Sequence, residues 1–159
     1  MRVVYFWMVV IFLAVVAGGC SKIETDQPEN MSDRTLITSE NMGRIMGMQW
    51  ILRSMTIDGQ SYELAAKKPF VRFDEDGKVS GSASVNRFFG SIRMDEQGQL
   101  TWISPLGATN MAGPDELMKQ ETIFLSSLPK TERIRLEKIH LYMSTTDGQA
   151  ELVFCVPVK

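Results

Sequence analysis

The sequence has few of the side chains that commonly carry catalytic or metal chemistry. Its 159 residues include one histidine, His140, and two cysteines. This leaves almost no ligand set for zinc, and no glycine-rich phosphate loop of the Walker or dinucleotide type precedes a helix. The eleven methionines are soft ligands, but they form no tight repeated motif. We therefore expect no metal site, no cofactor and no catalytic residue.

The chain also lacks an excess of positive charge. Seventeen Lys and Arg residues stand against nineteen Asp and Glu residues, which gives a formal net charge of -2. Nucleic-acid binding domains usually carry a basic patch or stripe that neutralises phosphates. We therefore expect no nucleic-acid partner.

No hydrophobic run is long enough to span a bilayer. The longest, from Val3 to Ala17, follows Met1-Arg2 and has about 15 residues, whereas a spanning helix needs about 20. It has the length of a signal-peptide core, so residues 1–19 are predicted to be a signal peptide.

The end of this run, Ala17-Gly18-Gly19-Cys20, resembles the lipobox of bacterial lipoproteins. The resemblance implies cleavage between Gly19 and Cys20, acylation of Cys20, and membrane attachment through the lipid. Ser21 resembles the sorting signal of lipoproteins held at the periplasmic face of the outer membrane. Ala17 departs from the usual branched aliphatic residue, so ordinary secretion with an unmodified Cys20 stays an alternative, and an uncleaved membrane anchor comes last.

The residues that follow the predicted signal peptide are mostly polar. Residues 20–48 show no sustained strand or helix period and are predicted to be a lipidated N-terminus and flexible tether. The folded domain is expected over residues 49–159. Its one thiol, Cys155, lies in the apolar run LVFCVPV, so a buried inert thiol is expected, with a reactive thiol as the alternative.

Most of this domain has the alternating pattern of β-strands. Asp-Gly pairs at 58–59, 76–77 and 147–148 mark hairpin turns between apolar runs. We count about seven short strands. These fall near residues 50–57, with a short continuation around Tyr62, and near residues 71–73, 78–85, 100–103, 134–136 and 139–143, with a last strand towards the C-terminus.

One segment has a convincing helical pattern, from Pro114 to about Leu128. Pro114 and the two acidic residues after it suit a helix start, and Pro129 marks the stop. An apolar stripe along this helix must be covered by the strands. The predicted fold is α+β, mainly antiparallel β, with the strands curled around or packed on one amphipathic helix.

Glu121 lies near the middle of the apolar stripe, where a carboxylate needs a partner. One candidate is Arg87, within the stretch GSASVNRFFG; alternatively, Glu121 lies at the margin of the stripe and reaches solvent. We interpret GSASVNRFFG as a corner of the fold, in which Gly81 and Gly90 permit sharp turns, Asn86 bonds backbone groups and Phe88 or Phe89 fills the bend. A ligand site is the alternative.

The ordered set of these motifs resembles the META (HslJ-like) domain family. It comprises Trp50-x-Leu52, Val79-Ser-Gly81, Asn86-Arg87-Phe88-x-Gly90, Thr109-x-Met111, and a helix carrying Glu121. The resemblance covers residues 49–156. It implies a compact β-rich domain in envelope lipoproteins linked to stress and antibiotic tolerance, without an established enzymatic activity.

The sequence departs from the family pattern at two positions. Relatives often have cysteine where this chain has Val85 and Gly113. If those cysteines pair in relatives, losing both avoids an unpaired thiol.

The predicted function is therefore that of a non-catalytic envelope lipoprotein that binds a protein or another envelope component. Two alternatives stay open. One is a small-ligand carrier with a cavity inside the sheet. The other is a hydrolase that uses His140 together with a nearby carboxylate and hydroxyl.

Overall fold

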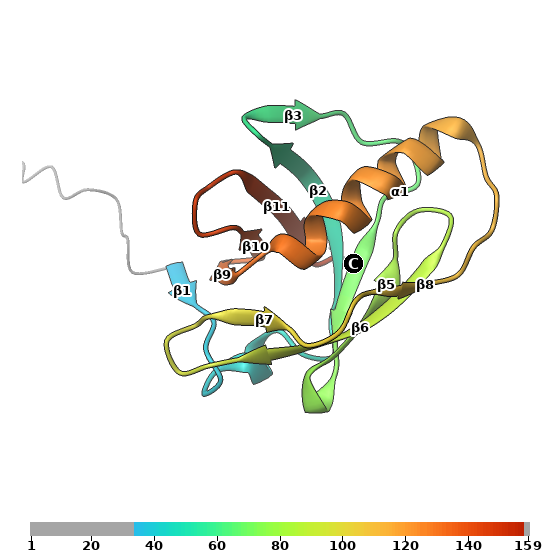
Figure 1. The fold of residues 1–159 in the computed structure, drawn as a ribbon. Coiled ribbons are helices and arrows are strands. Elements are labelled where there is room, and N and C mark those ends of the chain that lie inside the picture. The colour runs from blue at the N-terminus through green and yellow to red at the C-terminus, as the bar shows by residue number, and fades with distance from the viewer. Residues whose placement is uncertain (1–33, 158–159) are drawn as a thin grey trace, which may run out of the picture.

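The computed structural model describes residues 34–157, and eleven strands there form one antiparallel sheet (Figure 1). The strand order is β1-β9-β10-β11-β2-β4-β5-β6-β7, with β3 paired to β2 and β8 paired to β6. The strands are β1 (Arg34–Leu36), β2 (Gln49–Ile57), β3 (Gln60–Tyr62), β4 (Phe70–Phe73), β5 (Lys78–Ser82), β6 (Arg87–Met94), β7 (Leu100–Trp102), β8 (Gly107–Ala108), β9 (Arg133–Glu137), β10 (His140–Ser144) and β11 (Ala150–Cys155).

The expected fold of about seven strands on one helix is wrong: the described residues form a β-dominated structure with more strands and a single short helix. The largest omission is β6, which has eight residues. The small residues and glycines of GSASVNRFFG predict a corner, but the bend is confined to residues 83–86, and residues 87–90 already belong to β6. The two-residue strand β8 and three-residue strand β1 are too short to show a period.

Part of the expected tether belongs to the folded domain. Strand β1 pairs with β9, and the 3-10 turn Met42–Arg44 (η2) follows it. Ile37 and Ile45 are fully buried, and the Trp50 indole N–H donates to the Ile45 carbonyl at 2.9 Å. The folded region therefore begins before residue 49. Residues 20–33 of the expected tether, the predicted signal peptide and Cys20 lie outside the described residues.

The sheet curls until its two ends meet. The Leu100 amide of β7 donates to the carbonyl of Glu132, just before β9, at 2.8 Å. The concave side encloses large aromatic side chains, and Phe124 of the helix lies with its ring centre 5.7 Å from that of Phe88 and 6.4 Å from that of Phe154. These rings, with Trp50 and Phe73, fill the interior.

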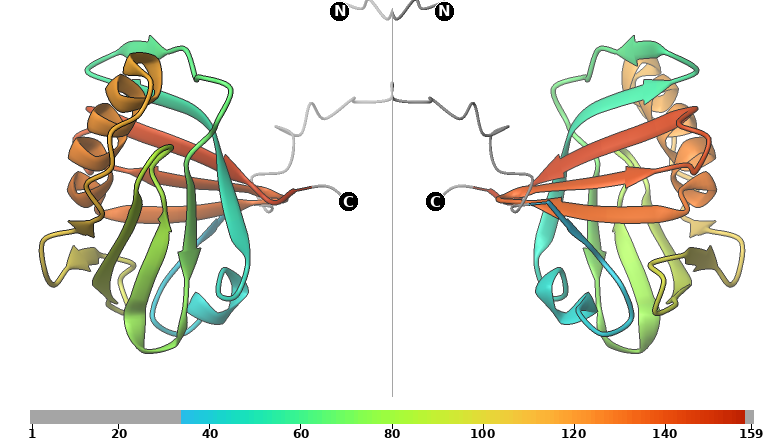
Figure 2. Two further views of the ribbon diagram at one scale, coloured as in Figure 1. Left: turned by 90° about the vertical axis from the view of Figure 1, so that its right-hand side faces the viewer. Right: turned by 90° about the vertical axis from the view of Figure 1, so that its left-hand side faces the viewer.

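Helix α1 (Asp115–Ser127) lies along one side of the curled sheet (Figure 2). Another 3-10 turn, η4 (Leu128–Lys130), follows it directly and contains Pro129. The buried face of α1 contains Phe124 but also Gln120 and Glu121. This helix therefore brings two polar side chains into the core, and both need partners there.

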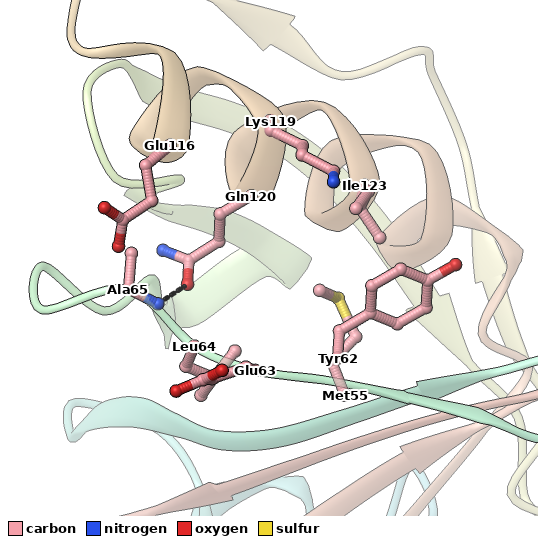
Figure 3. A pocket seen from close by; sticks show the side chains of 9 residues that line it. All are labelled: Met55, Tyr62, Glu63, Leu64, Ala65, Glu116, Lys119, Gln120 and Ile123. Carbon is pink, nitrogen blue, oxygen red and sulfur yellow. Dashed lines mark hydrogen bonds between the residues drawn. The ribbon is translucent and has the colours of Figure 1, made fainter.

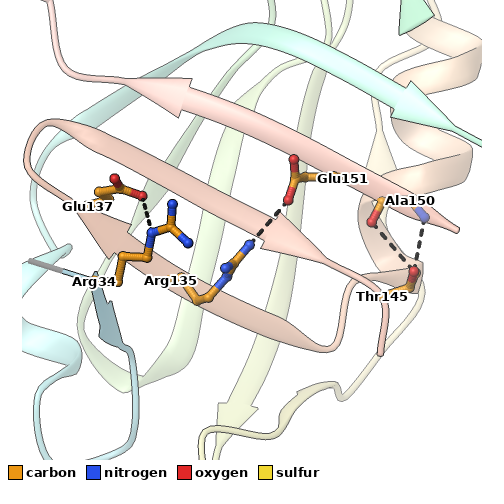
Figure 4. Close-up of polar contacts among 6 residues, drawn as sticks. All are labelled: Arg34, Arg135, Glu137, Thr145, Ala150 and Glu151. Carbon is orange, nitrogen blue, oxygen red and sulfur yellow. Dashed lines mark hydrogen bonds and ion pairs between the residues drawn. The ribbon is translucent and has the colours of Figure 1, made fainter. Parts of the chain in front are cut away.

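The outer face of the sheet carries charged pairs (Figure 4). Arg34 pairs with Glu137 at 3.0 Å, and Arg135 pairs with Glu151 at 3.3 Å while its guanidinium lies 5.5 Å from the centre of the Tyr142 ring. Such exposed pairs contribute little to stability. In the part of the chain from 34 to 157, no helix is long and apolar enough to cross a membrane.

Candidate functional site

Asn86 is the centre of a buried hydrogen-bond network. Its carbonyl oxygen Oδ1 accepts bonds from the Thr109 hydroxyl at 2.8 Å and the Met111 amide at 2.7 Å. Its amide nitrogen Nδ2 donates to the Met111 carbonyl at 3.1 Å and to Glu121 Oε1 at 2.6 Å. The side chain therefore uses both acceptor sites and both donor hydrogens. This fixes the chain after β8 against the elbow between β5 and β6.

Glu121 is held by amide groups rather than by an arginine. Its Oε2 atom accepts bonds from the backbone amides of Val85 at 3.0 Å and Asn86 at 2.7 Å. The residue is only 5% exposed. The backbone donors of the elbow, together with Asn86 Nδ2, compensate the burial of this carboxylate.

The candidate pair of Arg87 and Glu121 is not formed, and Glu121 does not reach solvent either. The side chain of Arg87 is exposed because β6 alternates: Asn86 and Phe88 are buried, whereas Arg87 and Phe89 face outwards. The Arg87 backbone still joins the network, because its amide donates to the Thr109 hydroxyl at 3.1 Å. The structure thus brings Asn86, Thr109, Met111 and Glu121 together and leaves the guanidinium outside.

Sequence reasoning missed Gln120 and Ser84. Gln120 accepts a bond from the Ala65 amide at 2.8 Å and donates to the Lys67 carbonyl at 2.9 Å and the Ser84 hydroxyl at 2.6 Å. Ser84 is fully buried with a φ of 130°, a strained conformation that its surroundings must enforce. The sequence signal that could have identified Gln120 is its position next to Glu121 in the buried stripe of the helix, where a polar side chain needs partners.

Two motif glycines, Gly81 in β5 and Gly90 in β6, permit close packing around these strands. A Cβ atom on Gly81 would lie 2.1 Å from the Phe70 carbonyl oxygen and 2.7 Å from the Phe88 ring. A Cβ on Gly90 would meet the flexible end of Leu106 at 2.7 Å. Substitution at Gly81 therefore requires the backbone of β4 to move, whereas Gly90 has a more adaptable neighbour.

The two positions that depart from the family pattern are neighbours in space. A Cβ built on Gly113 would lie 3.4 Å from the Val85 Cβ and 2.5 Å from one of its methyl groups. Disulfide-bonded residues have Cβ atoms about 3.5 to 4.5 Å apart. Val85 thus packs against the backbone of Gly113 at a place where a cross-link has room.

A hollow with a volume of about 390 Å³ lies between α1 and the segment after β3, and we call it the helix hollow (Figure 3). It is lined by Met55, Tyr62, Glu63, Leu64, Ala65, Glu116, Lys119, Gln120 and Ile123. Its apolar lining comes from both the sheet and the helix. The ionisable groups at its margin are two carboxylates and one ammonium, so its charge is negative overall.

Among residues 34–157, the hollow at His140 does not bring this ring together with a hydroxyl group and a carboxylate. It faces Glu137 and Cys155 in the register of β10, and its ring centre lies 6.4 Å from that of Tyr142. The hollow that His140 lines also contains Arg53 and Cys155, but no serine, threonine or carboxylate side chain. Cys155 is a free, buried thiol.

The family model of the META domain matches residues 43–156. A solution structure of a protein from Burkholderia xenovorans is similar, with a TM-score of 0.61, 18% identity, and coverage of 74% of this chain and 86% of that chain. A crystal structure of a DUF4847 family protein from Bacteroides vulgatus has a TM-score of 0.51 and 10% identity, covering 70% of this chain and 93% of that chain.

At such identities these structures establish similarity of fold alone. No curated protein matches the chain. The family match covers most of the sequence and includes the motif residues that meet at Asn86. The chain belongs to the META domain family.

Proposed function

We propose that this protein is a lipid-anchored, non-catalytic binding protein of the bacterial envelope. Its partner would be a protein or another envelope component that places an apolar, positively charged group in the helix hollow. The anchor is Cys20, and the expected location is the periplasmic face of the outer membrane. The family resemblance suggests a role in stress or antibiotic tolerance.

The helix hollow is the observation that carries this proposal. Its volume of about 390 Å³ lies in the range of pockets that hold small ligands or a few side chains. Met55, Leu64 and Ile123 offer apolar contact, and Glu63 and Glu116 favour a cation. For a ligand with both an apolar part and a positive charge, apolar contacts would offset part of the free energy that desolvation of the charge costs.

A non-catalytic role is supported by how the family motif is used. The polar groups of Asn86, Thr109 and Glu121 form hydrogen bonds with one another and with backbone atoms. A carrier with an internal cavity is less well supported, because Phe88, Phe124 and neighbouring aromatic rings fill the concave side. Binding at a surface hollow fits this arrangement better.

Membrane attachment is tested with Cys20→Ala and with globomycin, which blocks lipoprotein signal processing. We expect an unprocessed or unanchored precursor in cell fractionation. Normal processing and membrane retention of Cys20→Ala would refute the lipid anchor.

Binding in the helix hollow is tested by photo-crosslinking in living cells. A benzoylphenylalanine probe at Lys119 lines the hollow, and the matched probe at Thr122 lies on an exposed part of the same helix. We expect an adduct specific to position 119 that weakens when Glu63→Lys and Glu116→Lys are added. Equal adducts at both positions, or adducts indifferent to the charge reversals, would contradict the proposed site.

A further inference from the structure

A second hollow, of about 340 Å³, contains three methionines from distant parts of the chain, and we call it the methionine hollow. It is lined by Ser39, Met42, Met46, Asp76, Gly77, Ile92, Arg93, Met94 and Ile103. Met42 and Met46 lie in and just after the 3-10 turn η2, and Met94 ends β6. The hollow is separate from the helix hollow and shares no residue with it.

Backbone contacts hold the three contributing segments together. The Ser39 amide donates to the Asp95 carbonyl at 3.0 Å, which places the segment before η2 beside the end of β6. Gly77 lies so close to β6 that a Cβ atom there would be 2.3 Å from the Ile92 carbonyl oxygen. The hollow is therefore a fixed feature of the fold.

The thioether groups give this hollow a chemistry that leucine or isoleucine would not supply. Met42 is 7% exposed, and Met46 and Met94 are half-buried. Thioether sulfur is polarizable and a soft ligand, and the unbranched side chain has three rotatable bonds with which to aim the sulfur. The carboxylate of Asp76 adds a negative charge to the lining and offsets the positive charge of Arg93.

We propose that the methionine hollow binds one soft monovalent cation, Cu(I) or Ag(I), through the sulfur atoms of Met42, Met46 and Met94. Thioethers select such ions over harder divalent cations. Within residues 34–157 there is no group of three or more His, Cys, Asp or Glu side chains placed to hold a metal ion. Because thioethers do not exchange protons, binding should change little between pH 6 and 8.

The test uses the full chain in detergent with Cys20→Ala and Cys155→Ala, since both thiols would otherwise bind the probe. Ag(I) is titrated by calorimetry, and the methionine ε-methyl groups are followed by ¹³C NMR. We expect saturation at one ion per chain, with shifts of three ε-methyl signals. Zn(II) should give no saturable binding.

Three single variants, Met42→Leu, Met46→Leu and Met94→Leu, should each weaken Ag(I) binding at least tenfold. Leucine nearly conserves the volume, so the fold should survive, and thermal melting checks this. The matched controls Met111→Leu and Met118→Leu lie outside the hollow and should leave the affinity unchanged. Absence of saturable Ag(I) binding, or equal losses in the controls, would overturn the proposal.

Discussion

Replacement of Asn86 by alanine should be among the most destabilising single changes in the domain. The substitution removes four side-chain hydrogen bonds, one of them to the buried carboxylate of Glu121. A neutral bond contributes about 1 kcal/mol and a bond to a charged group about 1.5 to 3 kcal/mol. Three neutral bonds and one bond to a charged group give an expected loss of about 4.5 to 6 kcal/mol in the free energy of unfolding. Because two backbone amides still hold Glu121, no further penalty for an unpaired buried charge is added.

Urea denaturation followed by tryptophan fluorescence measures this loss. Arg87→Ala is the matched control: it changes the next residue in the same motif, whose side chain is exposed. We expect it to alter the free energy of unfolding by less than about 0.5 kcal/mol. A double-mutant cycle of Asn86→Ala and Glu121→Ala should give a coupling energy of about 1.5 to 3 kcal/mol. Equal losses for Asn86→Ala and Arg87→Ala, or zero coupling, would refute the network's role.

Three further predictions concern other parts of the domain. In a Cys20→Ala/Cys155→Ala background, the pair Val85→Cys/Gly113→Cys should form a disulfide on oxidation and raise the free energy of unfolding by about 3 to 4 kcal/mol over the reduced form, given a loop of about 29 residues. Two titratable thiols after oxidation would contradict this. Gly81→Ala should lower the free energy of unfolding, measured by urea denaturation, by more than about 2 kcal/mol, because its Cβ would collide with a carbonyl oxygen of β4. A change near zero would show that the backbone of β4 moves to accommodate the methyl group. Hydrogen bonds from the Thr146 side chain and then its backbone amide hold the pKa of Glu132 below its ordinary value of 4.5. The stabilisation from these hydrogen bonds is therefore present above pH 4.5 and is lost as the pH falls through the lowered pKa of Glu132. The difference in unfolding free energy between the parent and Glu132→Gln should therefore shrink in melts at acid pH. A difference that does not change with pH would refute this dependence.

The arrangement at Asn86 explains why asparagine and arginine precede two phenylalanines. In a strand, successive side chains face opposite sides. Asn86 and Phe88 therefore enter the core, where one satisfies Glu121 and the other packs on Phe124. Arg87 and Phe89 face outwards, and Phe89 is 63% exposed.

Local sequence patterns predict correctly the features that depend on neighbouring residues. The helix Asp115–Ser127 lies within the predicted range of 114–128, since its proline stop and apolar spacing are local signals. The turn at Asp58-Gly59 has both residues at positive φ, as the Asp-Gly pair predicts. The polar position of Glu121 in a buried stripe likewise indicated that this carboxylate would need a partner.

The partners of Glu121, in contrast, depend on contacts between segments that are distant along the chain. Glu121 accepts hydrogen bonds from the amides of Val85 and Asn86, which lie more than thirty residues earlier in the sequence. Val85 and Gly113 are also in contact although they are far apart along the chain. Strand β1 joins β9 about a hundred residues away, so the segment that contains it gave no local signal of being folded. The methionine hollow likewise unites η2 with the end of β6. Periodicity reports which face of an element is buried, whereas the choice of contact across the core depends on how the whole sheet curls.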